Sequence, residues 1–558
     1  MAMDNSIPKT QTAVQLTAAD ELELNTQKAV DEPGPYQILC RVEMVGLCFS
    51  DLKLLKQFAG HVRKGEVVSG VDEQALKEIP SYVPGSLPAV PGHEAVVRVC
   101  AVGDKVRGIE PGGRYLVQTD YRWIATENSN AAFGYNFEGA LQEYVLMDQR
   151  VITSPDGDSM LIPASEELSA SAVGLVEPWA CVEDAYAVVE RSSLVEGGRM
   201  LVVADAGFDG NIFTAFLGRF GRPSKITCCM QKGTLGELDI PVEEAGSVAE
   251  LGDAEFDDVI YFGSDAETAG ALFGKMAAKG LLNIVLCGGE FDGDVTAGVG
   301  RIHYGGIRLI GTAGSDPAES MECIPRTGEI RAGDKINVVG AAGPMGVMHV
   351  IRNICEGVEG VTVFAGDPDA DRLSALSRIA EPLACRAGVT YVPYSPGGAM
   401  PDAAFDYTAI MAPIPALVAE AIKTSADRGI INIFAGIPMT VNAGIDLNSY
   451  IRNRLYFIGT SGSTLDDMKT VLGKVENRTL DTNLSVAAVG GLKVAVEGIK
   501  AVENRLIAGK IIIYPACMDL PLTKLEDLKD RLPKVAECLD DGLWTKEAED
   551  ALLSEAGS

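Results

Sequence analysis

A duplicated pattern in the middle of the chain constrains the fold more than any other feature. The segment 197–221 (GGRMLVVADAGFDGNIFTAFLGRFG) has an apolar run, a glycine-containing turn and a helical pattern, and 333–354 (GDKINVVGAAGPMGVMHVIRNI) repeats them in the same order. The ends of the two blocks, 279–316 and 428–465, also agree with each other. Similarity over this length indicates a repeated domain. Because strands alternate with helices in both copies, we predict two tandem doubly wound parallel sheets.

The second copy carries a dinucleotide-binding fingerprint, which makes the repeated unit Rossmann-like. In its turn GAAGPMG (340–346), glycines let the backbone approach a pyrophosphate at a helix N-terminus. The next strand ends at Asp367, 21 residues after Gly346, where an acid binds the ribose hydroxyls. Because Asp367 repels a 2′-phosphate, we expect NAD(H) rather than NADP(H). The candidate cofactor-binding residues are Gly340, Gly343, Pro344, Met345, Gly346, Asp367 and Arg372.

The first copy has a damaged version of this fingerprint. Asp205 stands where the first glycine belongs, in the turn DAGFDG (205–210). Asp205 and Asp209 put negative charge beside a pyrophosphate site, and the helix dipole offsets such charge by only ~0.3–1 kcal/mol. Its second strand, SKITCCMQKG, ends without an acid. We expect that the first copy has lost dinucleotide binding, and a different ligand there stays open.

Three segments outside the repeats offer metal ligands. They are GLCFSD (46–51), PGHEAVVRV (91–99) and LVEPWACV (175–182), and the chain has only four histidines in 558 residues. Together they supply a thiolate, an imidazole and carboxylates, which can hold one Zn²⁺ and leave a position for water or substrate. The alternative for the cysteine is a small buried hydrophobic residue. The candidate metal residues are Cys48, His93, Glu94 and Glu177.

These segments resemble the zinc-type medium-chain dehydrogenase/reductase family, the polyol, threonine and alcohol dehydrogenases. GLCFSD fits the family's Gly-Ile-Cys-x-Ser/Thr-Asp, EPWACV is similar to Glu-Pro-Leu-Ala of the polyol branch, and 133–152 is similar to the strand that closes the catalytic lobe. The resemblance covers most of the chain. It implies one GroES-like β-rich catalytic domain into which the two Rossmann-like domains are inserted.

The resemblance also implies a role for each residue of the motifs. Cys48, His93 and Glu177 become ligands of one catalytic zinc, with Glu94 as an alternating carboxylate. Ser50 hands on the substrate proton, and Asp51 supports the metal site. The implied domains are a catalytic domain (1–190), a degenerate Rossmann-like domain (191–316), a linker (317–331), an NAD-binding Rossmann domain (332–462), and the rest of the catalytic domain with C-terminal helices (463–558).

The implied activity is hydride transfer between NAD(H) and a secondary alcohol or ketone of a polyol, sugar or sugar derivative. Two alternatives stay open. One is a sugar epimerase or lyase that uses tightly bound NAD transiently, and the other is a non-catalytic scaffold derived from a dehydrogenase. Metal analysis separates the scaffold from the enzymes, because a decayed site binds no zinc.

Several departures from the family pattern bear on the site. No cysteine lies between Cys100 and Cys181, where the family carries four for a structural zinc, so we expect no structural zinc. The 44 residues between Cys48 and His93 include an unusual polar segment, 60–85, which is either a substrate lid or a surface excursion. Lys53 stands where alcohol dehydrogenases carry the last histidine of the proton relay. We expect His61, within 60–85, to be solvated.

Charge and composition narrow the partners. A net charge of −31 argues against nucleic acid and anionic membranes, which repel such a chain. No apolar run reaches the ~18–20 residues of a membrane span, so we expect a cytoplasmic protein with reduced thiols that acts on a small molecule. We also expect the last strands of the two copies, in 307–316 and 455–464, to join edge to edge in an intramolecular pseudo-dimer. Homo-oligomerisation stays open.

Overall fold

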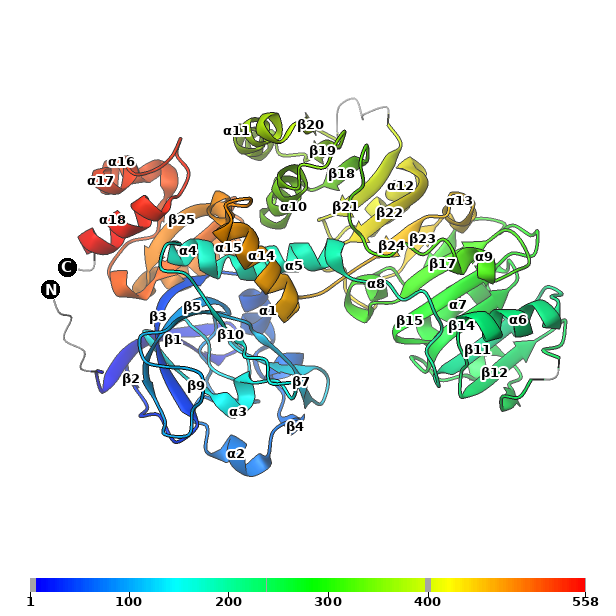
Figure 1. Cartoon of the computed structure of the whole chain (residues 1–558), viewed down its shortest axis with the longest axis horizontal. Coiled ribbons are helices and arrows are strands. Elements are labelled where there is room, and N and C mark those ends of the chain that lie inside the picture. Colours follow the sequence, from blue (N-terminus) through cyan, green and yellow to red (C-terminus); the bar gives the residue numbers. More distant parts are fainter. Residues whose placement is uncertain (1–6, 237, 397–402, 557–558) are drawn as a thin grey trace. The chain divides into compact units, whose positions relative to one another are not determined.

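The computed structural model describes residues 7–236, 238–396 and 403–556, and the chain divides into two compact units (Figure 1). The first unit comprises Met1–Cys181 and Gly462–Ser558, and the second comprises Val182–Ser461. The second unit is therefore an insertion in the first, and helix α5 (Val176–Ala187) runs across the first boundary. None of the helices in the described part of the chain has the length and apolarity needed to cross a membrane.

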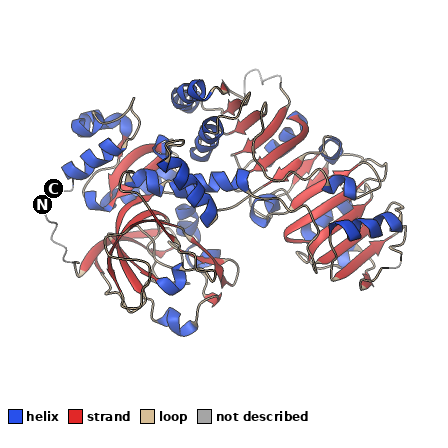
Figure 2. Ribbon diagram, viewed as in Figure 1, coloured by secondary structure: helices blue, strands red, loops and turns tan. Residues whose placement is uncertain are grey.

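The first unit is built around an eight-stranded, largely antiparallel sheet (Figure 2). Its two longest strands are rich in β-branched and apolar residues, which suit a buried pleated surface. The sheet order is β10 (Leu161–Pro163), β6 (Arg114–Val117), β5 (Glu94–Val102), β3 (Gln37–Gly46), β26 (Lys510–Tyr514), β25 (Val486–Gly491) and β27 (Thr523–Lys524), with β9 (Tyr144–Asp148) also paired to β3. The strands from both chain segments share one sheet, so the unit is a single β-rich domain.

The segment 60–85 packs into this unit. Its strand β4 (Val67–Ser69) pairs with β7 (Asp120–Thr126), which pairs with β8 (Asn130–Ala132). Lys64 is fully buried, and its ammonium donates to the carbonyls of Val83 and Leu87. The segment is therefore anchored in the domain at Lys64, whereas other parts of it, such as Glu73 and Lys77, are exposed at the surface.

The second unit contains two separate six-stranded parallel sheets. In copy one the order is β13 (Val242–Glu244), β12 (Lys225–Met230), β11 (Arg199–Ala204), β14 (Phe256–Phe262), β15 (Met276–Val285) and β17 (Arg308–Thr312). In copy two it is β20 (Thr390–Tyr394), β19 (Thr362–Gly366), β18 (Lys335–Val339), β21 (Phe405–Ile410), β22 (Ser425–Ile433) and β24 (Tyr456–Ile458). Both orders are the doubly wound 3-2-1-4-5-6 arrangement, which confirms the predicted fold class.

The helices of the two copies differ at one position. Copy one has α6 (Gly210–Phe220), α7 (Ala266–Lys275) and α8 (Gly300–Gly305), whereas copy two has α10 (Pro344–Cys355), α11 (Ala370–Ala387), α12 (Pro415–Thr424) and α13 (Leu447–Arg452). Helix α11 connects the second and third strands of copy two. The described residues that connect the same strands of copy one form no helix.

The last strands of the two copies lie against each other, as predicted, but without strand pairing. The Tyr450 hydroxyl, just before β24, donates to the Leu309 carbonyl on β17 at 2.8 Å, and the Arg308 guanidinium on β17 donates to the Gly459 carbonyl at 3.4 Å. Among the described residues β17 and β24 form no hydrogen-bonded ladder, so the two sheets stay separate. The inter-copy pair is instead β16 (Val295–Ala297) with β23 (Ala443–Ile445), antiparallel. One apolar core also contains side chains of both copies. The copies meet because short strands outside the main sheets pair and a common core is buried, and a pseudo-dimer as a functional arrangement stays a proposal.

The predicted linker is partly helical. Residues 317–331 include α9 (Ala318–Met321), and the Ser320 hydroxyl donates to the Asn283 side chain at 2.7 Å.

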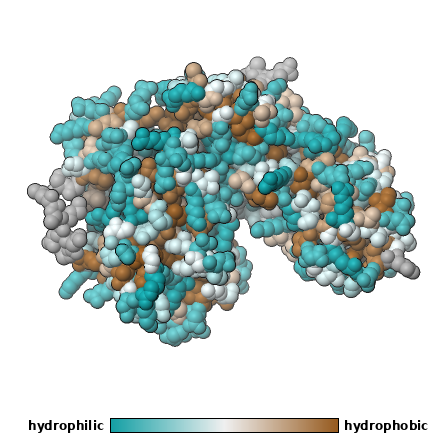
Figure 3. Space-filling view, viewed as in Figure 1, coloured by the Kyte–Doolittle hydropathy of each residue, from teal (hydrophilic) through white to brown (hydrophobic). Residues whose placement is uncertain are grey.

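The last part of the chain contains α16 (Leu528–Arg531), α17 (Pro533–Ala536) and α18 (Lys546–Ala556), within the first unit. Figure 3 shows hydrophilic residues over much of the visible face, with apolar residues scattered among them.

Candidate functional site

A single buried carboxylate ties the first two metal-ligand motifs together. Helix α1 (Phe49–Gln57) begins directly after Cys48, close to the end of β3. Asp51 in its first turn accepts from the Cys48 backbone N–H at 3.1 Å and from the Gly92 N–H at 3.3 Å. One oxygen of Asp51 also lies 3.2 Å from His93 Nδ1. With Nδ1–H donating to Asp51, His93 Nε2 carries the lone pair that a metal needs.

Cys48, His93 and Glu94 form a compact group of potential metal ligands. One ligand atom of each lies within 4.8 Å of the others. Cys48 is half-buried and the other two side chains are buried. A sulfur, a nitrogen and an oxygen ligand are the donor types that catalytic zinc sites use. One oxygen of Glu94 is buried without a hydrogen-bond partner among the described residues, so the donor set fits a zinc ion.

The other oxygen of Glu94 pairs with Lys510, the first residue of β26. Burial opposes the charged form of this lysine, but Glu94 and Cys48 outweigh burial and raise the pKa of Lys510 above its usual value. Gly46 leaves room for the carboxylate, because a Cβ there would lie 2.2 Å from Glu94 Oε2. Sequence reasoning missed Lys510. Its only signal is a lysine at the start of the apolar strand KIIIY (510–514).

Glu177 lies outside the compact ligand group. It is 7% exposed in the first turn of α5. Burial raises the pKa of its carboxyl to about 7, and the negative charge of Glu94 adds to the rise while His93 opposes it. The structure thus brings three of the four predicted ligands together, with Glu177 within electrostatic reach of them.

Ser50 lies beside the group. Its hydroxyl oxygen is 3.7 Å from the sulfur of Cys48, and it occupies the first turn of α1. The position suits a hydroxyl that receives a proton from a molecule bound at the ligand group.

A wall of side chains next to His93 was missed by sequence reasoning. The ring of Tyr135 lies 5.8 Å from the His93 ring and 5.1 Å from the His61 ring. The Arg63 guanidinium lies 5.6 Å from the Tyr135 ring centre and forms an ion pair with Asp120. The expectation that His61 is solvated is wrong, because the side chain is 9% exposed and burial lowers its pKa to about 4. Packing of 60–85 against the loop 133–139 buries it.

The glycine-rich turn of copy two leads directly into helix α10. Gly343 is the N-cap of α10 and Pro344 is its first residue. A Cβ on Gly346 would lie 2.2 Å from the carbonyl oxygen of Gly340, so only glycine lets the helix approach the turn this closely. Because Gly343 has no side chain, the first N–H groups of the helix are left for a phosphate.

Asp367 directly follows β19 and contacts the glycine-rich turn. Its carboxylate accepts from the Ala342 N–H and from the Asp369 N–H, each at 3.0 Å. Arg372, at the start of α11, lies with Nε 3.4 Å from an Asp369 oxygen. The turn and Asp367 form a cradle that fits a dinucleotide, whereas the side chain of Arg372 is paired with Asp369.

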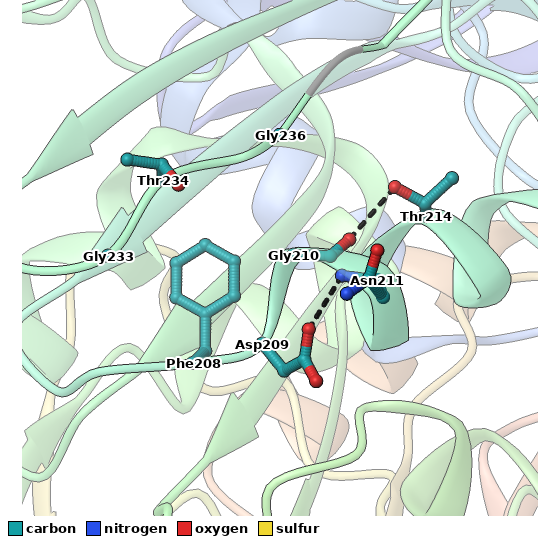
Figure 4. A pocket seen from close by; sticks show the side chains of 8 residues that line it. All are labelled: Phe208, Asp209, Gly210, Asn211, Thr214, Gly233, Thr234 and Gly236. Atoms are coloured by element: carbon teal, nitrogen blue, oxygen red, sulfur yellow. Dashed lines mark hydrogen bonds between the residues drawn. The ribbon is translucent and has the colours of Figure 1, made fainter.

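The corresponding region of copy one is blocked at the helix and open beside it (Figure 4). Asp209 is the N-cap of α6, and its carboxylate accepts from the Asn211 N–H at 2.8 Å. The Phe208 ring stacks on Phe262 at 4.2 Å. A cavity of about 650 Å³ lies beside them, lined by Phe208, Asp209, Gly210, Asn211, Thr214, Gly233, Thr234 and Gly236. A carboxylate occupies the place where a phosphate would be held.

Part of the chain is similar to known dehydrogenases. The alcohol dehydrogenase GroES-like domain family matches residues 34–156. Mannitol-1-phosphate 5-dehydrogenase of Aliivibrio fischeri is 26% identical over 249 residues, 40% of this chain and 57% of the relative. L-sorbose 1-phosphate reductase of Klebsiella pneumoniae is 30% identical over 159 residues, 27% of this chain and 37% of the relative. The chain thus spans less than two thirds of the length of these relatives.

The fold has solved counterparts. The crystal structure of 2R,3R-butanediol dehydrogenase from Bacillus subtilis superposes with a TM-score of 0.51 at 14% identity, covering 91% of this chain and 100% of that one. At this identity the likeness concerns the fold alone. Residues 34–156 are thus similar to the alcohol dehydrogenase GroES-like domain, and the chain as a whole has the fold of a dehydrogenase of this kind, with two Rossmann-like domains in place of one.

Proposed function

We propose that the protein is an NAD(H)-dependent zinc oxidoreductase that interconverts a secondary alcohol and a ketone in a polyol, a sugar derivative or their phosphates. The observation that carries the proposal is the group of Cys48, His93 and Glu94, whose ligand atoms lie within 4.8 Å of one another, with His93 and Glu94 buried. The two relatives are named for a phosphorylated polyol and a phosphorylated ketose, which supports this substrate class.

The chain's own residues prepare the site. Cys48 and His93 would hold the zinc together with Glu94 or Glu177, and a bound zinc polarises the oxygen of the substrate as a Lewis acid. Asp51 fixes the ring of His93 and the start of α1 through the contacts described above. The ammonium of Lys510 offsets the charge of Glu94.

Proton transfer falls to Ser50. Its hydroxyl lies 3.7 Å from the Cys48 sulfur and accepts the proton that the alcohol loses on oxidation. Because Lys53 replaces the usual last histidine of the relay, Ser50 passes this proton to water or to a ribose hydroxyl of the cofactor.

The cofactor is assigned to copy two. The first N–H groups of α10 bind the pyrophosphate, and Asp367 accepts hydrogen bonds from ribose hydroxyls. The carboxylate of Asp367 repels the 2′-phosphate of NADP(H), which selects NAD(H).

The test compares the wild-type protein with Cys48→Ala. Zinc is quantified by mass spectrometry, and NADH formation is followed with sorbitol, mannitol 1-phosphate and butane-2,3-diol. We expect one zinc per wild-type chain, and we expect Cys48→Ala to lose zinc and activity while its circular dichroism spectrum is unchanged. Cys100→Ala is the matched control, because Cys100 lies on β5 outside the ligand group and its loss leaves zinc in place.

Each other outcome has a definite meaning. Full activity in Cys48→Ala contradicts the site. Wild-type protein without zinc and without turnover favours the scaffold alternative, and NAD that stays bound without net NADH favours the epimerase or lyase. Glu94→Gln and Glu177→Gln, assayed for zinc, decide which carboxylate completes the ligand set.

A further inference from the structure

Tyr135 is a buried phenol whose hydroxyl has no partner among the described residues. The residue is 4% exposed. Burial, together with nearby charges, raises the pKa of its hydroxyl, and none of these influences is a hydrogen bond. Buried tyrosine hydroxyls in folded proteins usually have a hydrogen-bond partner. The Tyr135 ring centre lies 5.8 Å from that of His93, so the side chain lies beside the ligand group.

The segment 60–85 also contacts the Tyr135 ring. His61 lies against one part of the ring at 5.1 Å, and Arg63 lies over it at 5.6 Å. Arg63 is itself fixed, because it is bonded to both carboxylate oxygens of Asp120 and its backbone N–H donates to His61 Nδ1 at 3.2 Å. The ring is therefore locked while its hydroxyl stays available.

The end of the segment fastens the loop that carries Tyr135. The Val83 N–H donates to the Asn136 carbonyl at 2.8 Å, and the Glu138 N–H donates to the Ser81 carbonyl at 2.9 Å. The Tyr82 and Phe137 rings lie 5.1 Å apart. The insertion and the Tyr135 loop thus form one packed wall of the pocket.

We propose that Tyr135 binds the substrate, with its hydroxyl donating to an oxygen on the carbon next to the reacting one, so that the site selects vicinal diols and α-hydroxyketones. This inference rests on the proposed function. A group that lies beside His93 reaches only atoms close to the reacting carbon. His61 and Arg63 act as positioning residues for the Tyr135 ring. The polyol preference of the enzyme then resides in Tyr135, and the insertion 60–85 positions it.

The experiment uses the zinc-loaded full chain and the variant Tyr135→Phe. We compare kcat/KM for butane-2,3-diol, which has the neighbouring hydroxyl, with kcat/KM for butan-2-ol, which lacks it. Loss of one neutral hydrogen bond corresponds to a decrease of roughly threefold to tenfold, expected for the diol alone. Zinc content is measured on the same samples and stays at the wild-type level. An equal change for both alcohols, or no change, overturns the inference.

The positioning role of Arg63 is tested by measuring KM and kcat separately. Arg63→Ala should raise KM for the diol more than it lowers kcat, and Arg63→Lys should restore part of this loss because it keeps the ion pair with Asp120. The ratio of the two alcohols separates positioning from general damage, since a misfolded pocket affects both.

A binding measurement keeps this inference distinct from the proposed function. If the wild-type protein oxidises neither these two alcohols nor sorbitol nor mannitol 1-phosphate, the proposed function fails, and calorimetric titration of the zinc-loaded protein with sorbitol decides on Tyr135. Sorbitol that binds wild type at least threefold more tightly than Tyr135→Phe supports the inference. Equal binding, or no binding by either protein, overturns it.

Discussion

The two Rossmann-like copies share one strand order but satisfy the start of their first helix in opposite ways. In copy two the N-cap of α10 is Gly343, which has no side chain, and its first N–H groups are left for a phosphate. In copy one the N-cap of α6 is Asp209, whose carboxylate accepts from Asn211. A helix start that is satisfied by its own side chain needs no anion. The two caps are not equivalent positions, because Asp209 precedes Gly210 whereas Gly343 lies three residues before the matching Gly346, so the first helix of copy one starts two residues later in register.

The copies also differ in what surrounds the turn. In copy two, α11 covers the sheet after β19, and Asp367 binds the turn. In copy one, Phe208 stacks on Phe262 over the turn. Copy one still contributes to the common core and to the β16–β23 pair, so it is tied to its partner by packing. The Rossmann-like sheet and its packing can therefore be kept without the cofactor cradle.

The largest expected effect comes from giving copy two the cap of copy one. Gly343→Asp places a carboxylate where the pyrophosphate binds and gives α10 its own N-cap. We expect the affinity for NAD, measured by calorimetry, to fall about a hundredfold, which corresponds to roughly 2.7 kcal/mol.

Removal of the carboxylate at the helix start of copy one is the control. Asp209→Gly should leave one NAD per chain with unchanged affinity and should lower stability by only about a few tenths of a kcal/mol. A second equivalent of NAD in this variant would show that Asp209 alone closes copy one, and unchanged affinity in Gly343→Asp would remove the cofactor from copy two.

The next effect concerns pH. His349 on α10 follows Gly346 by three residues, where copy one has Phe213 three residues after Gly210, and both side chains are fully buried. Burial, with a smaller contribution from Arg352, lowers the pKa of His349 to about 3, and its Nδ1 lies 2.8 Å from the Tyr186 hydroxyl. The unfolded chain takes up the proton first, at about 6.5, so this residue destabilises the fold as pH falls below that value.

We expect His349→Phe to remove this component. Between pH 7.5 and pH 5 the wild-type free energy of unfolding should fall by about 2 kcal/mol more than that of the variant, measured by urea denaturation. His349→Gln, which does not titrate, should behave like His349→Phe. Identical pH profiles for all three proteins would show that His349 is accessible to protons in the folded state.

The smallest effect concerns the acid that copy one lacks. Asp367→Ala removes the ribose acceptor and the charge that repels a 2′-phosphate. We expect NAD binding to weaken about tenfold and the preference for NAD over NADP to shrink. Asp367→Asn removes the charge but keeps an acceptor for the Ala342 N–H. It therefore distinguishes the effect of the negative charge from the effect of the hydrogen bond that supports the turn. Unchanged discrimination in both variants would place the specificity elsewhere.

Local patterns predicted much of this protein. The alternation of strands and helices gave both parallel sheets, and the spacing from Gly346 to Asp367 gave the cradle that the structure assembles. The motifs around Cys48 and His93 predicted a ligand group. Cys48 follows the end of β3 and His93 precedes the start of β5, so the local sequence of each motif sets the direction of its strand. Their mutual distance needed the carboxylate of Asp51, which was predicted only as a support.

The contacts between distant parts of the chain could not be predicted in the same way. Lys510 pairs with Glu94 across 416 residues of sequence, and no local pattern encodes that contact. The partner of β16 was also missed, because strands of three residues carry too short a pattern to specify register. His61 is buried because 60–85 packs on the loop 133–139. The polar composition of 60–85 does not predict this packing.

The sequence by itself determined the two Rossmann-like folds, the residue types at the ligand group and which copy keeps the glycine-rich turn. These features depend on backbone propensity, hydrophobic periodicity and short-range spacing, which act within a few residues of each position. The tertiary structure alone decided that Glu94 is paired by Lys510, that Tyr135 is locked beside His93 with its hydroxyl available, and that β16 and β23 connect the copies. Those features depend on which surfaces exclude water from each other, and burial is a property of the whole folded domain.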